Sequence, residues 1–260
     1  MNRHVLITFD LEEFDLPLEF GCHIPDDDQI NTSGYGLKQV SGLLAEYNIP
    51  ATFFTTSYFA LKNQEVIRDL SVNHEIASHS RYHSRFLEND LADSKTDLEK
   101  ITGKQIYGFR MPLFKNVDLS KINKAGYHYD SSINPTCVPG RYCNLFTQRK
   151  FYRDSGTNLI EIPLSVSPLI RFPLFWLSFK NIPLPVYLTL CRQALRKDSY
   201  LHLCFHPWEF ADLEPFNIPG YIKKVSGKQL SERFEKLILE LKKTCNFSTI
   251  SEFLDIKGIV

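Results

Sequence analysis

The chain has 260 residues and carries 30 basic and 30 acidic side chains, so its formal net charge at neutral pH is zero. This balance disfavours nucleic-acid binding, because a neutral chain has no field that attracts a polyanion. The length is sufficient for a sizeable buried core, and we expect one α/β domain spanning residues 1–260.

The first residues and the cysteines bear on the cellular compartment. Residues 5–9 form an apolar run that is too short for the core of a signal peptide, and no small-residue cleavage site follows it. We therefore expect a cytoplasmic protein. The six cysteines contain no Cys-x-x-Cys pair, and in a reducing compartment we expect all of them to be free thiols.

The apolar run over residues 5–9 predicts a strand covered on both faces, as in parallel sheets. It ends in Asp10, and Glu12 and Glu13 follow closely. Three acids at one strand end are costly by themselves, but they are useful where a cation or an arginine lies nearby. A solvated acidic loop is the alternative interpretation.

Helical and strand patterns alternate through the first half of the chain. Residues 14–36 are rich in loop-forming residues, and we expect an irregular crossing there, with a solvated turn at residues 26–28. The pattern then predicts helices over residues 37–47, 58–70, 91–101 and 119–125, and extended segments over residues 51–56, 75–78, 105–109 and 127–129.

The second half begins with a hairpin turn at residues 154–156, which we expect to join residues 151–153 to residues 159–164. Residues 168–190 are the most apolar stretch, but Pro173, Pro183 and Pro185, together with two charged residues, Arg171 and Lys180, exclude a membrane-spanning helix. We expect core or a lid there, with contact to a membrane or a lipid-linked substrate as the alternative. The remaining pattern predicts helices over residues 187–196 and 230–241, and strands over residues 200–205 and 247–250.

Residues 74–86 contain three of the eight histidines, and His79 and His83 are spaced four apart. On a helical turn such residues face the same side, so the two imidazoles could reach one metal ion. The strand expected over residues 75–78 places the pair at a strand end, where the sites of parallel α/β folds lie. The same spacing is also found on solvated helix faces.

Three further polar motifs follow expected strands. Arg110 begins the sequence Arg-Met-Pro-Leu-Phe, Asp130 begins Asp-Ser-Ser, and His206 begins His-Pro-Trp-Glu. Because side chains alternate along a strand, His202 shares a face with His206 but lies deeper in the fold. We expect His202 to be a packed core histidine.

Taken in chain order, these motifs resemble those of the polysaccharide deacetylases, carbohydrate esterase family four, also described as the nodulation-factor deacetylase homology domain. The resemblance extends from Thr8 to His206, although the Asp-Ser-Ser motif lacks the tryptophan of many members. It implies an α/β fold, a single-domain distorted (β/α) barrel with about seven strands. Residues 1–260 would form one polysaccharide deacetylase-like catalytic domain.

The resemblance also implies roles for individual residues. Asp10 is implied to be the general base, Arg110 to pair with it, and His206 to be the general acid. His79 and His83 are implied to bind a metal ion. Contacts with the substrate are implied for Pro112, Phe114, Asp130 and Trp208.

One position departs from the family pattern. The family usually has a second acid directly after the base, whereas this chain has Leu11. Residues two apart in an extended segment face the same way, so we expect Glu12 to supply the third metal ligand beside Asp10. Glu13 or water is the alternative.

These parts together predict a metal-dependent hydrolase that removes an acetyl group from an N-acetylated carbohydrate. Two imidazoles and one carboxylate suit zinc, and iron, cobalt or nickel would fit the same ligands. Two alternatives stay open: a cyclic amide or ureide hydrolase of the allantoinase-like type, and a sugar-binding barrel without catalysis. The identity of the sugar and its carrier, polymer, lipid or nucleotide, is not predicted.

Overall fold

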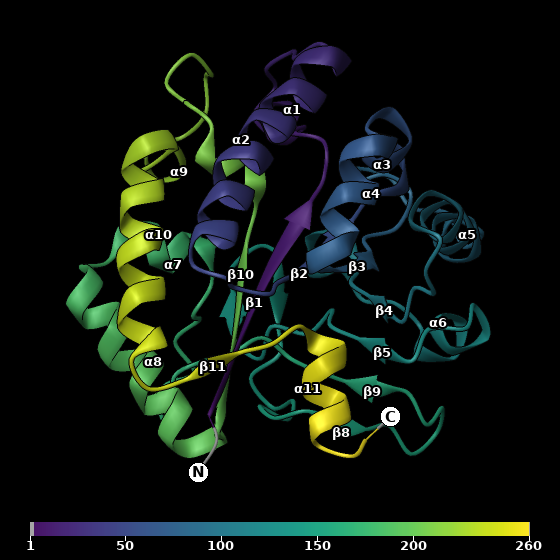
Figure 1. Ribbon diagram of the computed structural model, residues 1–260, viewed down its shortest axis with the longest axis vertical. Helices are drawn as coiled ribbons and strands as arrows, with labels where there is room; N and C mark the ends of the chain where they lie inside the picture. The colour runs from purple at the N-terminus through teal and green to yellow at the C-terminus, as the bar shows by residue number, and fades with distance from the viewer. Residues whose placement is uncertain (1–2, 260) are drawn as a thin grey trace.

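Seven short parallel strands form the centre of the molecule in the computed structural model, which describes residues 3–259. Their order across the sheet is β10-β1-β2-β3-β4-β5-β9. The sheet curls, with helices packed around it (Figure 1), so the expectation of a distorted (β/α) barrel with about seven strands is confirmed. The bounds are β1 His4–Leu11, β2 Thr52–Thr55, β3 Glu75–Ser78, β4 Gly108–Phe109, β5 Tyr129–Asp130, β9 Ile160–Glu161 and β10 Tyr200–Phe205.

The two ends of this row of strands meet loosely. No ladder joins β9 to β10 among the described strands, but the Ser165 amide, just after β9, donates a hydrogen bond to the His202 carbonyl of β10 (3.0 Å). Two strands extend the sheet, since β8 (Tyr152–Arg153) pairs antiparallel with β9 and β11 (Asn246–Phe247) pairs parallel with β1. A separate hairpin consists of β6 (Cys137–Val138) and β7 (Tyr142–Cys143).

Helices cover the outside of the barrel. The longer ones are α2 Asp26–Glu46, α4 Gln64–Asn73, α5 Asp90–Thr102, α8 Leu184–Asp198 and α10 Gly227–Lys242. The shorter ones are α1 Leu16–Glu19, α3 Ser57–Lys62, α6 Leu119–Lys124, α7 Trp176–Asn181, α9 Gly220–Lys223 and α11 Ile250–Ile256, with 3-10 turns η1 Pro112–Phe114 and η2 Pro207–Phe210. None of the helices within residues 3–259 is long and apolar enough to cross a membrane.

Strand alternation separates an outer core from the barrel interior. On β1, Ile7 and Phe9 belong to the large core beneath the outer helices, whereas Leu6 belongs to a second cluster in the interior. Phe253 of α11 joins this second cluster, and Figure 1 shows α11 beside the end of the molecule where β1 begins. The opposite, carboxyl-terminal end of the strands is left for polar residues such as Asp10.

The expected crossing over residues 14–36 is wrong in its second half, because α2 already begins at Asp26. The three aspartates at residues 26–28 are its first turn, where acids interact favourably with the helix dipole, rather than a solvated turn. Gly36 is needed for packing, since a Cβ on it would lie 1.9 Å from the Pro207 carbonyl oxygen of η2. Gly36 therefore allows α2 to approach the barrel closely.

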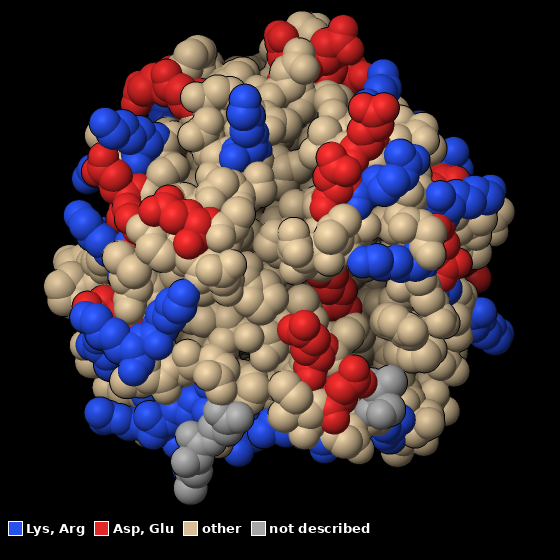
Figure 2. Space-filling model, in the orientation of Figure 1, with Lys and Arg blue, Asp and Glu red and all other residues tan. Residues whose placement is uncertain are grey.

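Other differences are local. The expected helix over residues 58–70 is two helices that meet at Asn63, and the predicted strand near residues 247–250 is short and followed by α11, which was not predicted. His79 and His83 lie in an irregular loop and not on a helical turn; within it Ser80 has a φ of +65°. Basic and acidic side chains both occur across the face shown in Figure 2.

Candidate active site

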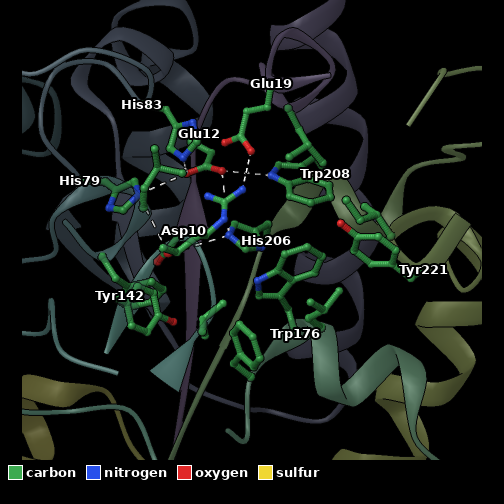
Figure 3. Close-up of a pocket in the computed structure, with 18 of the residues that line it drawn as sticks. Asp10, Glu12, Glu19, His79, His83, Tyr142, Trp176, His206, Trp208 and Tyr221 are labelled. Atoms are coloured by element: carbon green, nitrogen blue, oxygen red, sulfur yellow. Dashed lines mark hydrogen bonds and ion pairs between the residues drawn. The ribbon is translucent and has the colours of Figure 1, made fainter. Parts of the chain in front are cut away.

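The polar residues predicted from the motifs converge at the carboxyl ends of the strands. Asp10 and Glu12 come from the end of β1, His79 and His83 from the loop after β3, and His206 from the end of β10. All five line one cavity of about 240 Å³. Figure 3 shows Glu12, His79 and His83 gathered on one side of it and Trp176, Trp208 and Tyr221 on the other.

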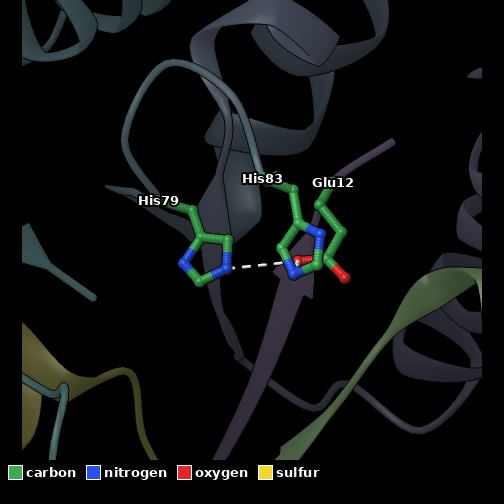
Figure 4. Close-up of side chains that lie close together, drawn as sticks. All are labelled: Glu12, His79 and His83. Atoms are coloured by element: carbon green, nitrogen blue, oxygen red, sulfur yellow. Dashed lines mark ion pairs between the residues drawn. The ribbon is translucent and has the colours of Figure 1, made fainter. Parts of the chain in front are cut away.

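Glu12, His79 and His83 form a cluster that could hold a metal ion. One ligand atom from each lies within 4.8 Å of the other two, and all three residues are buried. Glu12 Oε2 is 3.1 Å from His79 Nε2 and 3.4 Å from His83 Nε2, and Figure 4 shows its carboxylate next to both rings. Glu12 therefore lies next to the two histidines. This agrees with the expectation that residues two apart in an extended segment face the same way.

The other nitrogen of each ring fixes which atom faces this cluster. His79 Nδ1 lies 2.9 Å from the Arg110 carbonyl, which can only accept, so Nδ1 carries the hydrogen and Nε2 presents its lone pair. His83 Nδ1 lies 2.7 Å from Asp15 Oδ1, a carboxylate oxygen that accepts, so Nδ1 carries a hydrogen and Nε2 is the atom that faces the cluster. Such outer partners orient imidazole ligands in metal sites. Asp15 was not identified from the sequence.

The charges in the cluster favour a cation. Burial disfavours the charged imidazolium, but Glu12, Asp15 and Glu13 outweigh it and raise the pKa of His83 to about 10. A proton is thus strongly held where two carboxylates and an imidazole meet, and a metal ion would compete with it.

Glu13 points elsewhere. Its Oε1 accepts a hydrogen bond from the His83 amide (2.9 Å) and its Oε2 accepts one from the Thr56 hydroxyl (2.7 Å). Glu13 does not line the cavity, and burial raises the pKa of its carboxyl. Its contacts hold the histidine loop against the start of α3, so Glu13 supports the cluster from behind.

Asp10 is paired with Arg110, as the motifs implied. Arg110 Nη1 lies 2.6 Å from Asp10 Oδ1, and both side chains are buried. Burial opposes ionisation of Asp10, but the guanidinium, His79 and His206 together hold its pKa at about 2. Arg110 is fixed in turn by hydrogen bonds to Ser131 and to His202 Nε2 (3.0 Å).

His202 is a packed core histidine, as expected. It is fully buried, and burial followed by the nearby guanidinium lowers its pKa well below the ordinary value. The neutral ring accepts from Arg110 and lies 3.2 Å through Nδ1 from the Pro163 carbonyl. His202 does not line the cavity.

His206 lies on the other side of the cavity floor from the two histidines of the Glu12–His79–His83 cluster. Its Nε2 is 4.0 Å from Asp10 Oδ2 and 3.9 Å from Glu12 Oε1. Its Nδ1 is 3.1 Å from Glu209 Oε1, and Lys180 Nζ lies 3.4 Å from the second Glu209 oxygen. Burial disfavours the imidazolium, but the bond to Glu209 and the neighbouring carboxylates raise the pKa of His206.

Aromatic side chains build the cavity walls. Trp208 stacks on His206 with ring centroids 4.8 Å apart and donates from Nε1 to Glu12 Oε1 (3.2 Å), while Trp176 meets His206 edge-on. Phe114 and Tyr142 contact each other on the opposite wall. Leu113 and Phe114 both have positive φ, +59° and +52°, an uncommon turn for such residues.

Two of the residues implied to contact the substrate do not line the cavity. Pro112 is buried in η1, ahead of Leu113 and Phe114, which do line it. Asp130 is buried on β5, and its carboxylate accepts hydrogen bonds from the Ser132 hydroxyl (2.6 Å) and amide (2.9 Å). Tyr129 occupies the interior face of β5, so Asp130 points to the opposite face. Pro112 and Asp130 thus lie outside the lining of this cavity.

Asp15, Glu209, Trp176 and Tyr142 are the site residues that sequence reasoning missed. Glu209 could have been suspected, because it lies three residues after His206 in the His-Pro-Trp-Glu motif. The other three come from segments without a motif, and only the fold brings Trp176 and Tyr142 to the cavity and Asp15 to His83.

Comparisons with known proteins agree with this geometry. Residues 2–129 match the family model described as polysaccharide deacetylase, whereas a search of curated proteins finds no match. A probable polysaccharide deacetylase from Pseudomonas aeruginosa PAO1 has a similar structure, with a TM-score of 0.67, 14% identity, and coverage of 96% of this chain and 88% of that one.

Two further solved structures share the fold. The allantoinase PuuE aligns with a TM-score of 0.64 and 14% identity over 96% of this chain and 88% of that one. A family 4 acetyl xylan esterase from Clostridium thermocellum, in complex with a cobalt ion, aligns with a TM-score of 0.54 and 15% identity over 99% and 93%. The match to the polysaccharide deacetylase family model therefore covers about the first half of the chain, and the similarity to these solved structures shows that the chain as a whole shares their fold.

Proposed function

We propose that this protein is a metal-dependent deacetylase that removes the acetyl group from an N-acetylated carbohydrate, with residues 1–260 acting as one catalytic domain in the cytoplasm. The observation that carries the proposal is the donor set of the cavity. Two imidazoles have their hydrogens directed to outer partners, and both present Nε2 to one carboxylate oxygen of Glu12.

This donor set fits a divalent metal ion. Glu12 Oε2 is buried and has no hydrogen-bond partner within residues 3–259, which leaves a lone pair directed at the two Nε2 atoms. Two nitrogens and one carboxylate oxygen suit zinc best, and iron, cobalt and nickel accept the same ligands. When bound, such an ion supplies Lewis acidity for attack on an acetamide carbonyl.

Asp10 is the proposed general base. The Arg110 ion pair keeps it ionised, so at neutral pH it is ready to accept the proton of an attacking water molecule. Its second oxygen, Oδ2, is 4.0 Å from both His79 Nε2 and His206 Nε2. Asp10 therefore lies between the Glu12–His79–His83 cluster and His206, the proposed acid.

His206 is the proposed general acid. The contact with Glu209 orients the ring through Nδ1, so Nε2 faces the cavity, where the leaving amine would lie. The same contact favours the protonated imidazole, which is the form that can donate. Stacking against Trp208 and the edge of Trp176 holds the ring in place.

The aromatic walls favour a sugar ring as the group next to the scissile amide. Trp208, Trp176 and Phe114 offer flat apolar surfaces, and the acids and imidazoles at the floor offer polar partners. Phe114 and Trp208 are therefore our proposed substrate contacts, joined by Trp176. Pro112 and Asp130 act indirectly, by positioning the turn with Phe114 and the turn with Ser132.

The test combines metal analysis with an acetate-release screen over N-acetylated sugars. We expect the purified protein to bind one divalent ion and to release acetate from at least one sugar in the screen. In His206→Ala we expect turnover to fall by about 10²- to 10⁴-fold while metal binding survives.

Three outcomes would change the assignment. Loss of the ion in His206→Ala would make His206 a ligand instead of the acid. A protein that binds a sugar but binds no metal ion and releases no acetate would be a non-catalytic barrel. Because the fold is shared with an allantoinase, the screen includes cyclic amides and ureides, and activity on these alone would replace the deacetylase assignment.

A further inference from the structure

Three large apolar side chains stand out from the surface beside the cavity. Phe146, Leu169 and Ile170 are 101%, 94% and 75% exposed, the highest values of any large apolar residue in the described part of the chain. Exposed apolar side chains that occur singly need no explanation, but neighbouring ones of this size indicate a contact surface.

The loops that carry these side chains are hydrogen-bonded to each other. The Arg171 guanidinium donates to the Thr147 carbonyl (2.8 Å), and the Arg149 guanidinium donates to the Pro168 carbonyl (3.1 Å). The Thr136 hydroxyl also donates to the Arg171 carbonyl (2.7 Å). Phe146 precedes Thr147, and Leu169 and Ile170 lie between Pro168 and Arg171. The two loops that carry the three apolar side chains therefore lie next to each other, and we call residues 144–150 and 168–171 the docking surface.

The surroundings of the docking surface are basic, although the whole chain is neutral. Residues 131–197 contain nine basic side chains and two acidic ones. Four of the basic residues, Arg141, Arg149, Lys150 and Arg171, lie in or next to the two loops, which contain no acid. Arg141 and Arg149 are paired with Glu19 and Asp198, so part of this charge is neutralised.

We propose that the docking surface binds an anionic membrane surface. Lipid acyl chains provide the apolar environment that Phe146, Leu169 and Ile170 lack in water, and anionic headgroups complement the basic residues. Lys150 is exposed and has no carboxylate partner among residues 3–259, so its charge is available to a headgroup. The surface attaches the protein to the membrane reversibly, because no described helix spans a bilayer.

The docking surface is continuous with the walls of the cavity. The β6–β7 hairpin supplies Val138, Arg141 and Tyr142 to the cavity and leads into Phe146 three residues after β7 ends. The other loop is closed by a bridge between Val166 and Pro173 and leads into Phe175 and Trp176, which also line the cavity. Binding to a membrane therefore brings the cavity close to the lipid surface.

This position favours an N-acetylated sugar carried on a lipid as the substrate. A free or polymeric sugar has no need of a membrane contact, whereas the sugar of a lipid-linked saccharide is presented at the headgroup level. This extension rests on the proposed deacetylase function. The membrane contact itself does not, because it depends on other residues.

The test is co-sedimentation of the full chain with vesicles of phosphatidylcholine that contain phosphatidylglycerol, and with vesicles of phosphatidylcholine alone. We expect binding to the anionic vesicles and weaker binding to the neutral ones. Phe146→Ser should lower the vesicle affinity about tenfold or more, and the triple variant Phe146→Ser, Leu169→Ser, Ile170→Ser should lower it further.

Matched controls separate this surface from general stickiness. Leu87 is 70% exposed on another loop, and Leu87→Ser should bind as the wild type does. Lys150→Glu should weaken binding to anionic vesicles, whereas Lys228→Glu, at a side chain 90% exposed on α10, should not. Unfolding temperatures should be unchanged in all these variants, because none of the side chains is part of the core.

Several results would overturn the proposal. The first is absence of vesicle binding by the wild type, and the second is a loss of vesicle affinity in Leu87→Ser equal to that in Phe146→Ser. The third is self-association without vesicles that Phe146→Ser abolishes, which would mean that a second copy of the chain covers the docking surface. Glu12→Ala should bind vesicles as the wild type does, because Glu12 lies in the cavity and not on the docking surface. If the wild type binds vesicles but releases no acetate in the screen, the docking surface stands and only the deacetylase function is wrong.

Discussion

Two pairs of buried carboxylates in this barrel have opposite electrostatic properties. Asp10 and Glu12 lie at the end of β1, and both have pKa values lowered despite their burial. Asp130 and Glu161 are register partners on β5 and β9, and burial raises both of their pKa values. All four side chains are at most 3% exposed, so depth in the protein does not cause the difference.

The cause is the direction in which each strand presents its acid. Asp10 faces the barrel interior, where Arg110 and the histidines supply positive charge or hydrogen-bond donors. Asp130 and Glu161 follow Tyr129 and Ile160, which face the interior, so the two acids face the other side. The described residues give neither of them an ion pair. A single step along a strand therefore separates a reactive ionised carboxylate from one that retains its proton.

The largest effect is expected from removing Glu12 from its cluster with His79 and His83. Glu12→Ala deletes the one oxygen that both Nε2 atoms face, and we expect metal affinity to fall by more than about 10²-fold, beyond the effect of an outer partner. Glu13→Ala is the matched control, with a loss of about tenfold, because Glu13 only supports the histidine loop. Metal titration of both variants measures this. Retention of the ion in Glu12→Ala together with its loss in Glu13→Ala would reverse the assignment.

Removing the Arg110 guanidinium should give Asp10 a raised pKa, like those of Asp130 and Glu161. Arg110→Met leaves Asp10 buried without its partner, so we expect the protein to lose about 3–5 kcal/mol of stability. The pKa of Asp10 should rise, and the acid limb of the activity profile should move to higher pH. Arg110→Lys retains the charge but not the planar set of donors. Its stability and the pKa of its Asp10 should lie between those of the wild type and of Arg110→Met. An unmoved acid limb in Arg110→Met would show that Asp10 is not the base.

The outer partner of His83 should have a smaller effect. Asp15→Ala frees the His83 ring to rotate and to change tautomer, so we expect metal affinity to fall by about 10- to 100-fold. Asp15→Asn offers an oxygen that still accepts from Nδ1, and it should lose less. Isothermal titration with the chosen metal would compare the two. Equal affinities for wild type and Asp15→Ala would mean that the loop alone orients His83.

The sequence predicted this site to the extent that strands and motifs determine it. The strand ends at Ser78 and Phe205 were placed correctly, and β1 ends at Leu11, one residue beyond the predicted end at Asp10. The convergence of the acids and imidazoles follows from these strand ends. Asp15 could not be predicted, because it meets His83 across 68 residues of chain. Such a contact depends on how two loops pack, and neither loop has a periodic pattern.

The errors also have physical causes. The strand expected over residues 127–129 is Tyr129–Asp130 in the structure, and alternation along it places Tyr129 in the interior and turns Asp130 to the other face. Gly34 was among the residues that indicated a loop over residues 14–36, whereas it lies inside α2, and the close approach of α2 to η2 requires Gly36. In both places tertiary packing outweighed local propensity.

The smallest expected effect tests the unpaired acids. The pKa of Glu161 is raised to about 10, first by burial and then by the charge of Asp130. The folded state therefore holds a proton that the unfolded chain releases near pH 4.5. The stability associated with this proton is complete below that pH and is progressively lost as pH rises towards 10.

Glu161→Gln keeps the shape of the side chain and removes this dependence. At pH 8 we expect the variant to be more stable than wild type by about 1–3 kcal/mol, with little difference at pH 5. Urea unfolding at both pH values measures this, and Glu232→Gln, at an exposed acid on α10, serves as the control. Equal stability of wild type and Glu161→Gln at pH 8 would mean that a cation neutralises Asp130 and Glu161. The two pairs would then differ in the source of their positive charge and not in its presence.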